Sequence, residues 1–356
     1  MRSPSKALIG AGAGLAAAGV GAALGLAAER WTAGRARQAG VGEAYGSLRG
    51  VPQRVVADDG TRLYVEVDEP EHFGGRAPRR GSDEAVTVVF SHGFCLNQDI
   101  WHFQRQWLRG RFRLVFWDQR GHGRSETGPS EHYTVDQCGA DLRAVIEATT
   151  PSGPLVLVGH SMGGMTVMAL SAEHPDLVRE RVLGAALVAT SSGGLGEVSW
   201  GMHESVARLA HRVAPVALVG LTRAPRLVDR TRRIGSDLEQ LMVKRYSYAS
   251  DVPPELVRFT AAMIAATPID VVSGFLPGFD IHDKAEALAV LDGIEALVLS
   301  GADDLLTPPD HSEAIVRRLP GAEHVVVPDA GHMVMLEHPD VVNLHLGELL
   351  ERSTRS

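Results

Sequence analysis

Cysteine, positive charge and metal-binding patterns are all scarce in this chain of 356 residues. The 2 cysteines are too few for a disulfide scaffold and say little about the compartment. The 35 Lys and Arg stand against 43 Asp and Glu, and the resulting net charge of −8 argues against a nucleic-acid-binding surface. The 15 histidines include no H-E-x-x-H pattern and no pair with carboxylates at ligand spacing. A metal-dependent hydrolase is therefore disfavoured, and we expect neither a metal ion nor a cofactor.

The hydrophobic residues that are present, 44% of the chain, suffice for one large domain with an insertion. Residues 54–67 indicate a β-hairpin with its turn at Asp59-Gly60. Further strands are predicted at 86–91, 112–117, 155–158, 181–189, 296–301 and 324–328, and helices at 98–108, 136–148, 162–174 and 340–350. This alternation predicts an α/β fold with a mostly parallel sheet covered by helices on both faces.

The most informative stretch is residues 155–164, LVLVGHSMGG. A short buried strand leads into G-x-S-x-G, and a helix follows. A serine at the apex of a tight strand-to-helix turn needs small neighbours two residues away on either side. The turn exposes the hydroxyl of Ser161 near a helix N-terminus, where developing negative charge is favoured. Because this pattern also arises by chance, it predicts a nucleophile only together with a base and an acid elsewhere.

Two polar clusters downstream can supply those partners. One, residues 302–309, follows the predicted strand 296–301, and the other, residues 329–333, follows the strand 324–328. A serine hydroxyl needs a histidine to take its proton and a carboxylate to orient that histidine. In the strand-turn-helix architecture the order along the chain is serine, acid, histidine, which is the order found here.

From about Arg54 to Leu350 the chain resembles the α/β-hydrolase-fold enzymes of the lid-bearing esterase, haloperoxidase and C–C hydrolase group. The resemblance implies an α/β-hydrolase core with an eight-stranded, mostly parallel sheet and a helical lid. It is specific for the superfamily and unspecific for the substrate. The five matching motifs are Ser91-His-Gly-Phe94, Asp118-Gln-Arg-Gly-His-Gly-Arg-Ser125, Gly159-His-Ser-Met-Gly-Gly164, Gly301-x-x-Asp304-x-x-x-Pro308 and Gly331-His332.

Carried onto this sequence, the resemblance implies Ser161 as nucleophile, Asp304 as acid and His332 as base. Asp304 is favoured over Asp303 because the family places the acid three residues after the glycine and four before the proline. Asp303 remains the alternative acid. His160 is adjacent to the nucleophile, but we expect a structural role, because consecutive side chains diverge in such a turn.

The oxyanion hole needs two converging backbone N–H donors. One is expected from Met162, directly after the nucleophile, and the other from Phe94, in the loop after the strand 86–91. Gly93 allows the backbone conformation that points this amide inward. His92 is expected to be a scaffold residue of the loop, and no motif around Cys95 recommends it as a nucleophile.

The expected domain organisation is a core of residues 54–196 and 284–352 with a helical lid at 197–283. Helical stretches are predicted within the lid at 202–219, 237–247 and 254–266. Such a lid excludes water and shapes an apolar pocket. Five residues are candidates for the wall of this pocket, although side chains of this type more often belong to ordinary core packing: Trp200, Met202, Phe275, Phe279 and Met333.

Residues 1–30 form a hydrophobic N-terminal segment, followed by a basic linker at 31–53. The uncharged run from Ala7 to Ala28 has about 22 residues, enough to span a membrane, but its Ala and Gly insert only marginally. We expect a membrane anchor, with an export signal and a soluble leader as alternatives. Fractionation of the chain with and without residues 7–28 separates the three.

The expected function is therefore a serine hydrolase that cleaves a small-molecule carboxylic ester through an acyl-enzyme. C–C bond, lactone or amide hydrolysis on the same triad, or cofactor-free haloperoxidase activity, are alternatives. A non-catalytic relative that acts as a binding module is the alternative from a different class. Covalent labelling of the serine distinguishes that module from an enzyme.

Overall fold

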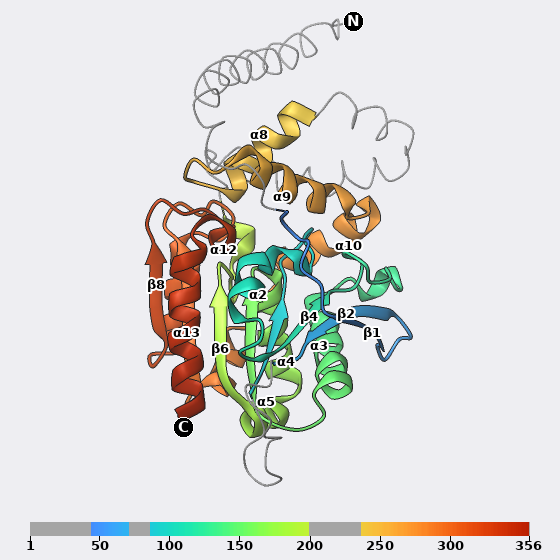
Figure 1. The fold of residues 1–356 in the computed structure, drawn as a ribbon, viewed down its shortest axis with the longest axis vertical. Helices are drawn as coiled ribbons and strands as arrows, with labels where there is room; N and C mark the ends of the chain where they lie inside the picture. Colours follow the sequence, from blue (N-terminus) through green and yellow to red (C-terminus); the bar gives the residue numbers. More distant parts are fainter. Residues whose placement is uncertain (1–43, 71–85, 199–235, 356) are drawn as a thin grey trace, which may run out of the picture. The chain divides into compact units, whose positions relative to one another are not determined.

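The computed structural model describes residues 44–70, 86–198 and 236–355 (Figure 1). By their contacts, residues 44–252 and 256–356 make up one compact unit, to which the sheet, the helices and the site below belong. Residues 253–255 at the start of one helix are assigned with residues 1–43 to a second unit. The predicted anchor, the linker up to residue 43 and the first lid stretch, 202–219, lie outside the described residues.

A mixed, mostly parallel sheet of eight strands forms the centre of the described fold, as predicted. The order is β1-β2-β4-β3-β5-β6-β7-β8, in which β1 pairs with β2 and β2 with β4 in the antiparallel sense. All other pairs are parallel. The strands are β1 (Val51–Val56), β2 (Arg62–Asp68), β3 (Thr87–Ser91), β4 (Arg113–Asp118), β5 (Leu155–His160), β6 (Val182–Val188), β7 (Glu295–Gly301) and β8 (Glu323–Val327).

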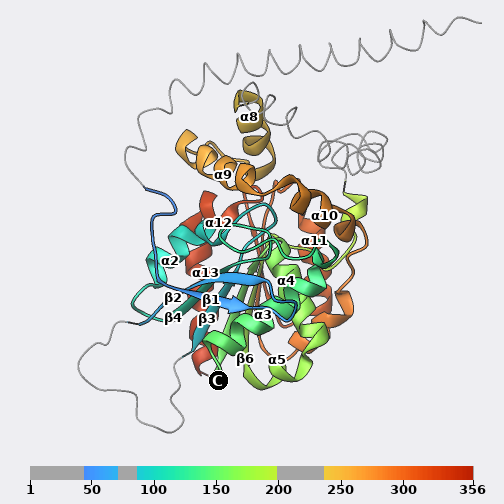
Figure 2. The same cartoon turned by 90° about the vertical axis from the view of Figure 1, so that its right-hand side faces the viewer.

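Each face of the sheet is covered by helices because successive strand residues point to opposite sides. Val88 and Phe90 belong to one apolar core together with α2 (His102–Leu108) and α13 (Pro339–Arg355), whereas Val89 belongs to the other. That second core includes residues of α3 (Val135–Thr149), α4 (Met162–Glu173) and α11 (Pro309–Arg318). Figure 2 shows α2 on one side of the sheet and α3 and α4 on the other. The strands are buried on both faces, which explains their continuous apolar runs.

The carboxyl ends of the parallel strands meet at one edge. Ser91 at the end of β3 pairs with Gly159 of β5, and Gly301 at the end of β7 pairs with Val327 of β8. The loops that follow these strands therefore begin side by side, although they come from widely separated parts of the sequence. They carry Phe94, Ser161, Asp304 and His332.

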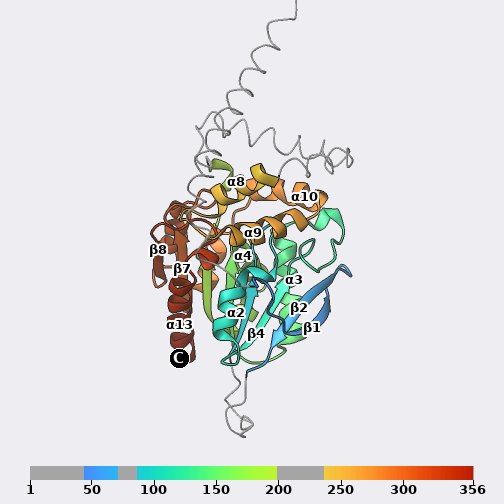
Figure 3. The same ribbon diagram turned by 45° about the horizontal axis from the view of Figure 1, so that its top comes forward.

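Figure 3 shows the three helices that follow the second gap in the described chain. Residues from each of them line the cavity at this edge. The three helices are α8 (Ser236–Ser247), α9 (Pro254–Ala266) and α10 (Ile269–Asp280). The bounds of α9 match the predicted stretch, and those of α8 match within one residue. Helix α10, which contains Gly274, Pro277 and Gly278, is not among the stretches predicted from the sequence. Short α5 (Pro175–Arg181) and α12 (Val334–Glu337) complete the list of named α-helices in the described regions.

In the ranges that the structure describes, no single helix is both long and apolar enough to cross a membrane. Taken together, α9 and α10 have the length and apolar composition of a membrane span, but they are bent by 92° at their junction. The N-terminal anchor stays a prediction.

Candidate active site

Ser161 occupies a sharp turn between β5 and α4. Its φ is +53°, a conformation that non-glycine residues rarely adopt. A Cβ at Gly163 would meet the backbone carbonyl of Ser91, and one at Gly159 would meet the backbone of Gly163. The small residues of G-x-S-x-G are therefore required because strand β3 and the start of α4 pack directly against the turn. The positive φ places backbone strain at Ser161, which lines the cavity described below.

Asp304 and His332 are hydrogen-bonded to each other. Nδ1 of His332 lies 2.8 Å from Oδ2 of Asp304, and since an ionised carboxylate only accepts, the imidazole donates through Nδ1. Thr307 donates through its hydroxyl to the same oxygen at 2.7 Å and through its N–H to the other oxygen at 3.0 Å. The side chains of Asp304 and His332 are almost fully buried. The carboxylate is thus held by several donors, and the imidazole is oriented with Nε2 as an acceptor that has no hydrogen-bond partner among the described residues.

Asp303 lies on the exposed side of the same loop. Its N–H donates to the carbonyl of Ala330, and no hydrogen bond from its carboxylate to His332 is found within the described ranges. The spacing rule that favoured Asp304 therefore agrees with the geometry.

His160 is fully buried, and its hydrogen bond supports a structural role and not that of the base. Its Nε2 lies 3.0 Å from the carbonyl oxygen of His332, to which it donates. Burial, together with the nearby His332, holds the pKa of His160 well below its usual range. A neutral His160 thus ties the end of β5 to the loop that carries His332.

A cavity of about 400 Å³ opens above the strand ends and is lined by both Ser161 and His332. Its walls are mainly apolar, with contributions from α4, α8, α9 and α10, among them Met165, Val243, Ile264 and Leu276. This volume is in the range of small-molecule sites. Of the predicted wall residues, Phe279 and Met333 line the cavity.

Phe275 does not line the cavity. It is 1% exposed and stacks on Tyr133, with ring centroids 5.4 Å apart, behind Phe94. The prediction of a wall position for Phe275 is therefore corrected to a core position. Trp200 and Met202 lie outside the described residues.

Phe94 and Met162, the two residues predicted to form the oxyanion hole, also line the cavity. Among the described residues, neither backbone N–H donates to a backbone carbonyl. Met162 is the first residue of α4, where the N–H groups have no partner within the helix. Both amides are therefore available to an oxygen atom of a substrate.

The loop before Phe94 is held by His92. Nε2 of this buried histidine accepts from the N–H of Gln119 at 2.9 Å, and Nδ1 donates to the carbonyl of Gly93 at 2.7 Å. Cys95 also lines the cavity, but burial raises the pKa of its thiol to about 12, which keeps it protonated. Its chemistry does not make it a nucleophile.

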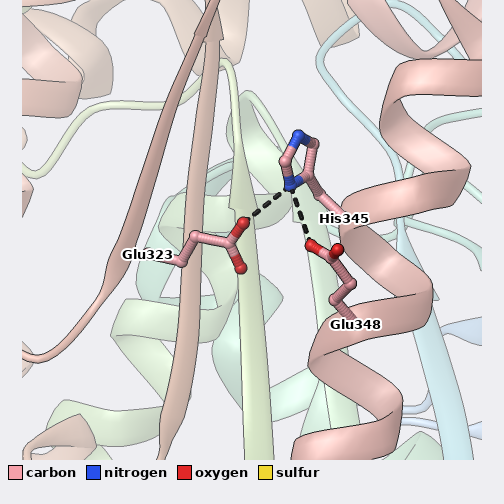
Figure 4. A group of neighbouring side chains, drawn as sticks. All are labelled: Glu323, His345 and Glu348. Carbon is pink, nitrogen blue, oxygen red and sulfur yellow. Dashed lines mark hydrogen bonds and ion pairs between the residues drawn. The ribbon is translucent and has the colours of Figure 1, made fainter.

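One group in the described chain has the composition of a metal site, Glu323, His345 and Glu348 (Figure 4). Nδ1 of His345 lies 2.6 Å from Glu323 and 3.3 Å from Glu348. The second carboxylate oxygen of Glu323 accepts from Arg352 at 2.8 Å. A divalent ion would have to compete with this guanidinium, and none of the three residues lines the cavity. These contacts join the edge strand β8 to α13.

The fold is shared with a known protein family. A family model described as "alpha/beta hydrolase fold" matches residues 86–339. The chain belongs to the α/β-hydrolase fold family. The match includes β3 to β8 together with Ser161, Asp304 and His332, and so spans all five motifs of the sequence analysis.

Among the relatives of this α/β-hydrolase is the putative non-heme bromoperoxidase BpoC of Mycobacterium tuberculosis. It is 28% identical over 260 residues, which cover 72% of this chain and 90% of the relative. The 3-oxoadipate enol-lactonase 2 of Acinetobacter baylyi is 25% identical over 231 residues, 58% of this chain and 82% of its own length. A solved esterase from Thermogutta terrifontis superimposes with a TM-score of 0.65 at 23% identity, covering 85% of this chain and 98% of the esterase. The last likeness shows the fold alone.

Proposed function

We propose that this α/β-hydrolase cleaves small to medium carboxylic esters through an acyl-enzyme on Ser161. The observation that carries the proposal is the Asp304–His332 hydrogen bond beside a largely apolar cavity that Ser161 and His332 share. A carboxylate that orients the imidazole, an imidazole whose Nε2 has no partner among the described residues, and a strained serine that lines the cavity are the components of acyl transfer.

In the proposed mechanism, Nε2 of His332 takes the hydroxyl proton as Oγ of Ser161 attacks the ester carbonyl. The carbonyl electrons move to oxygen, and the N–H groups of Met162 and Phe94 stabilise the oxyanion. The intermediate collapses, and His332 donates the proton to the departing alcohol. Water, deprotonated by His332, then attacks the acyl-enzyme and releases the acid. Asp304 stays ionised and stabilises the imidazolium that forms in each half-reaction.

The cavity favours an uncharged substrate with an apolar acyl or alkyl group. Aromatic and aliphatic side chains, including Phe94, Met165 and Phe279, dominate the lining. Transfer of such a group from water to these walls supplies binding free energy of roughly 25 cal/mol per Å² of buried apolar surface.

The substrate class is tested by a panel of p-nitrophenyl esters of increasing acyl length, together with lactone, amide and vinylogous diketone substrates. We expect the highest kcat/KM on an ester with an acyl chain of medium length, and no hydrolysis by Ser161→Ala. Ser130→Ala, which removes an exposed hydroxyl of the same kind, is the matched control and retains activity. Faster turnover of lactones or diketones than of every ester would replace the ester proposal.

A further inference from the structure

One carboxylate outside the proposed triad contacts both the segment after α8 and the loop of residues 328–333 that carries His332. Glu337, the last residue of α12, accepts the N–H of Gly331 through Oε2 at 2.6 Å. Its Oε1 accepts the N–H groups of Ala249 at 2.9 Å and Ser250 at 2.6 Å, and the hydroxyl of Ser250 at 2.7 Å. Gly331 directly precedes His332, whereas residues 249 and 250 are the second and third residues after the end of α8. The side chain thus bridges segments more than eighty positions apart.

A backbone hydrogen bond joins the same two segments. The N–H of Met333 donates to the carbonyl of Ser247, the last residue of α8, at 2.8 Å. A Cβ at Gly331 would lie 2.8 Å from that carbonyl oxygen and 2.9 Å from Cα of Tyr248. The loop and the end of α8 are therefore in direct contact on both sides of His332, without room for a side chain between them.

The helix held in this way forms part of the cavity wall. Met242, Val243, Tyr246 and Ser247 of α8 line the cavity, as does Met333. A shift of α8 therefore moves the wall and pulls on both neighbours of His332. A displacement of about 1 Å in a catalytic group can cost on the order of a hundredfold in rate.

The chemistry of the bridge requires a carboxylate. Four donors are shared between its two oxygens, and in the described chain no Arg or Lys forms an ion pair with it. Hydrogen bonds to an ionised acceptor are about twice as strong as neutral ones. An amide has a single acceptor oxygen, so glutamine would turn its NH₂ group toward N–H donors at one end of the bridge.

We infer that Glu337 is a positioning residue that couples the placement of α8 to that of His332. The inference rests on the proposed function, because it assigns His332 as the base. With α8 in this position, Glu337 binds the N–H of Gly331 and Ser247 binds that of Met333, so both neighbours of His332 are held. When α8 shifts, the base moves with it and the site loses its competent geometry.

The test compares wild type with Glu337→Gln and with the control Glu351→Gln. Glu351 is exposed on α13, and its side chain pairs with Arg355 of the same helix. The rate of Ser161 labelling by a fluorophosphonate measures the competence of the base. The downfield proton resonance of Nδ1–H in His332 measures its placement against Asp304. Thermal unfolding of each variant reports the folded state.

Glu337→Gln is expected to slow labelling roughly tenfold to hundredfold, and to weaken or shift the His332 resonance while the protein stays folded. Glu351→Gln is expected to match wild type in both. A wild-type labelling rate in Glu337→Gln, or slower labelling with an unchanged resonance, would overturn the inference. If Glu337→Gln does not fold, Glu337→Asp carries the same test, because it keeps the charge but is too short to span the bridge. Absence of labelling in wild type would instead contradict the proposed function, and the resonance would still test the coupling.

Discussion

At the scale of single residues, the site depends on which donors and acceptors face one another. Asp304 is buried and bonded to His332 and Thr307, whereas Asp303 next to it is exposed. Two adjacent carboxylates therefore have different environments and different expected roles. The serine–acid–histidine order and the Gly301–Pro308 spacing favoured Asp304, the carboxylate that is hydrogen-bonded to His332, and its role as the acid stays a prediction.

Replacement of these carboxylates separates their roles. Asp304→Asn removes the ionised acceptor that sets the tautomer of His332, and we expect kcat on a p-nitrophenyl ester to fall on the order of 10⁴-fold. Asp303→Asn is the matched control and should leave kcat close to the wild-type value. Steady-state kinetics of both variants measure the difference. A larger loss of kcat in Asp303→Asn than in Asp304→Asn would show that Asp303 is the acid and that the assignment of Asp304 is wrong.

Glu337 shows what sequence reasoning missed at this scale. Its donors are mostly backbone N–H groups of residues 249, 250 and 331, and no side-chain pattern marks a backbone donor. Phe275 is the converse case. Its aromatic character suggested the cavity wall, but the same character suits the stack with Tyr133 in the core. Residue type alone does not distinguish the two environments.

At the scale of elements, the strand ends and the nucleophile turn determine the site. The apolar runs predicted the strands well because a strand covered on both faces must be apolar throughout. Helices with proline or internal glycine were harder to predict. The predicted helix 162–174 stops before Pro175, but this proline also begins α5, which the sequence did not predict and where a missing N–H costs nothing. α11 likewise begins at Pro309, and α10 contains two glycines and a proline.

Alanine should have very different effects on stability at two helical glycines, one in the turn after β5 and one in α10. Gly163→Ala places a methyl group against the carbonyl of Ser91, and we expect the free energy of unfolding to fall by about 1–3 kcal/mol, with loss of esterase activity. Gly278→Ala in α10 has open space around the new Cβ and should be neutral or stabilising by about 0.5–1 kcal/mol. Urea unfolding of both variants gives these values. Equal effects would mean that the packing of β3 against α4 does not constrain the turn.

At the scale of the whole molecule, buried histidines link stability to pH. Burial lowers the pKa of His92 to about 3 and that of His122 to about 4, and it also lowers the pKa of His160. Below the ordinary value of 6.5, the unfolded chain binds protons that the folded chain does not. Stability is therefore lost as the pH falls below 6.5, by about 1.4 kcal/mol per pH unit for each histidine.

Asp118 acts in the opposite direction. Burial raises the pKa of this carboxyl to about 6, so between pH 6 and 4 the folded chain binds a proton that the unfolded chain does not. It offsets roughly one of the three histidines. We therefore expect the free energy of unfolding in urea to be clearly lower at pH 5 than at pH 7.5, and His122→Gln to reduce this difference. A stability that is the same at both pH values would contradict the burial of these groups as neutral histidines.

The account as a whole depends on the convergence of three loops from distant parts of the chain on one serine. The most direct measurement is mass spectrometry of peptides after reaction of the folded protein with a fluorophosphonate. We expect a single adduct, on the peptide that contains Ser161, which is absent from Ser161→Ala and forms much more slowly in His332→Ala. An adduct on another residue, or undiminished labelling of Ser161→Ala, would contradict the account.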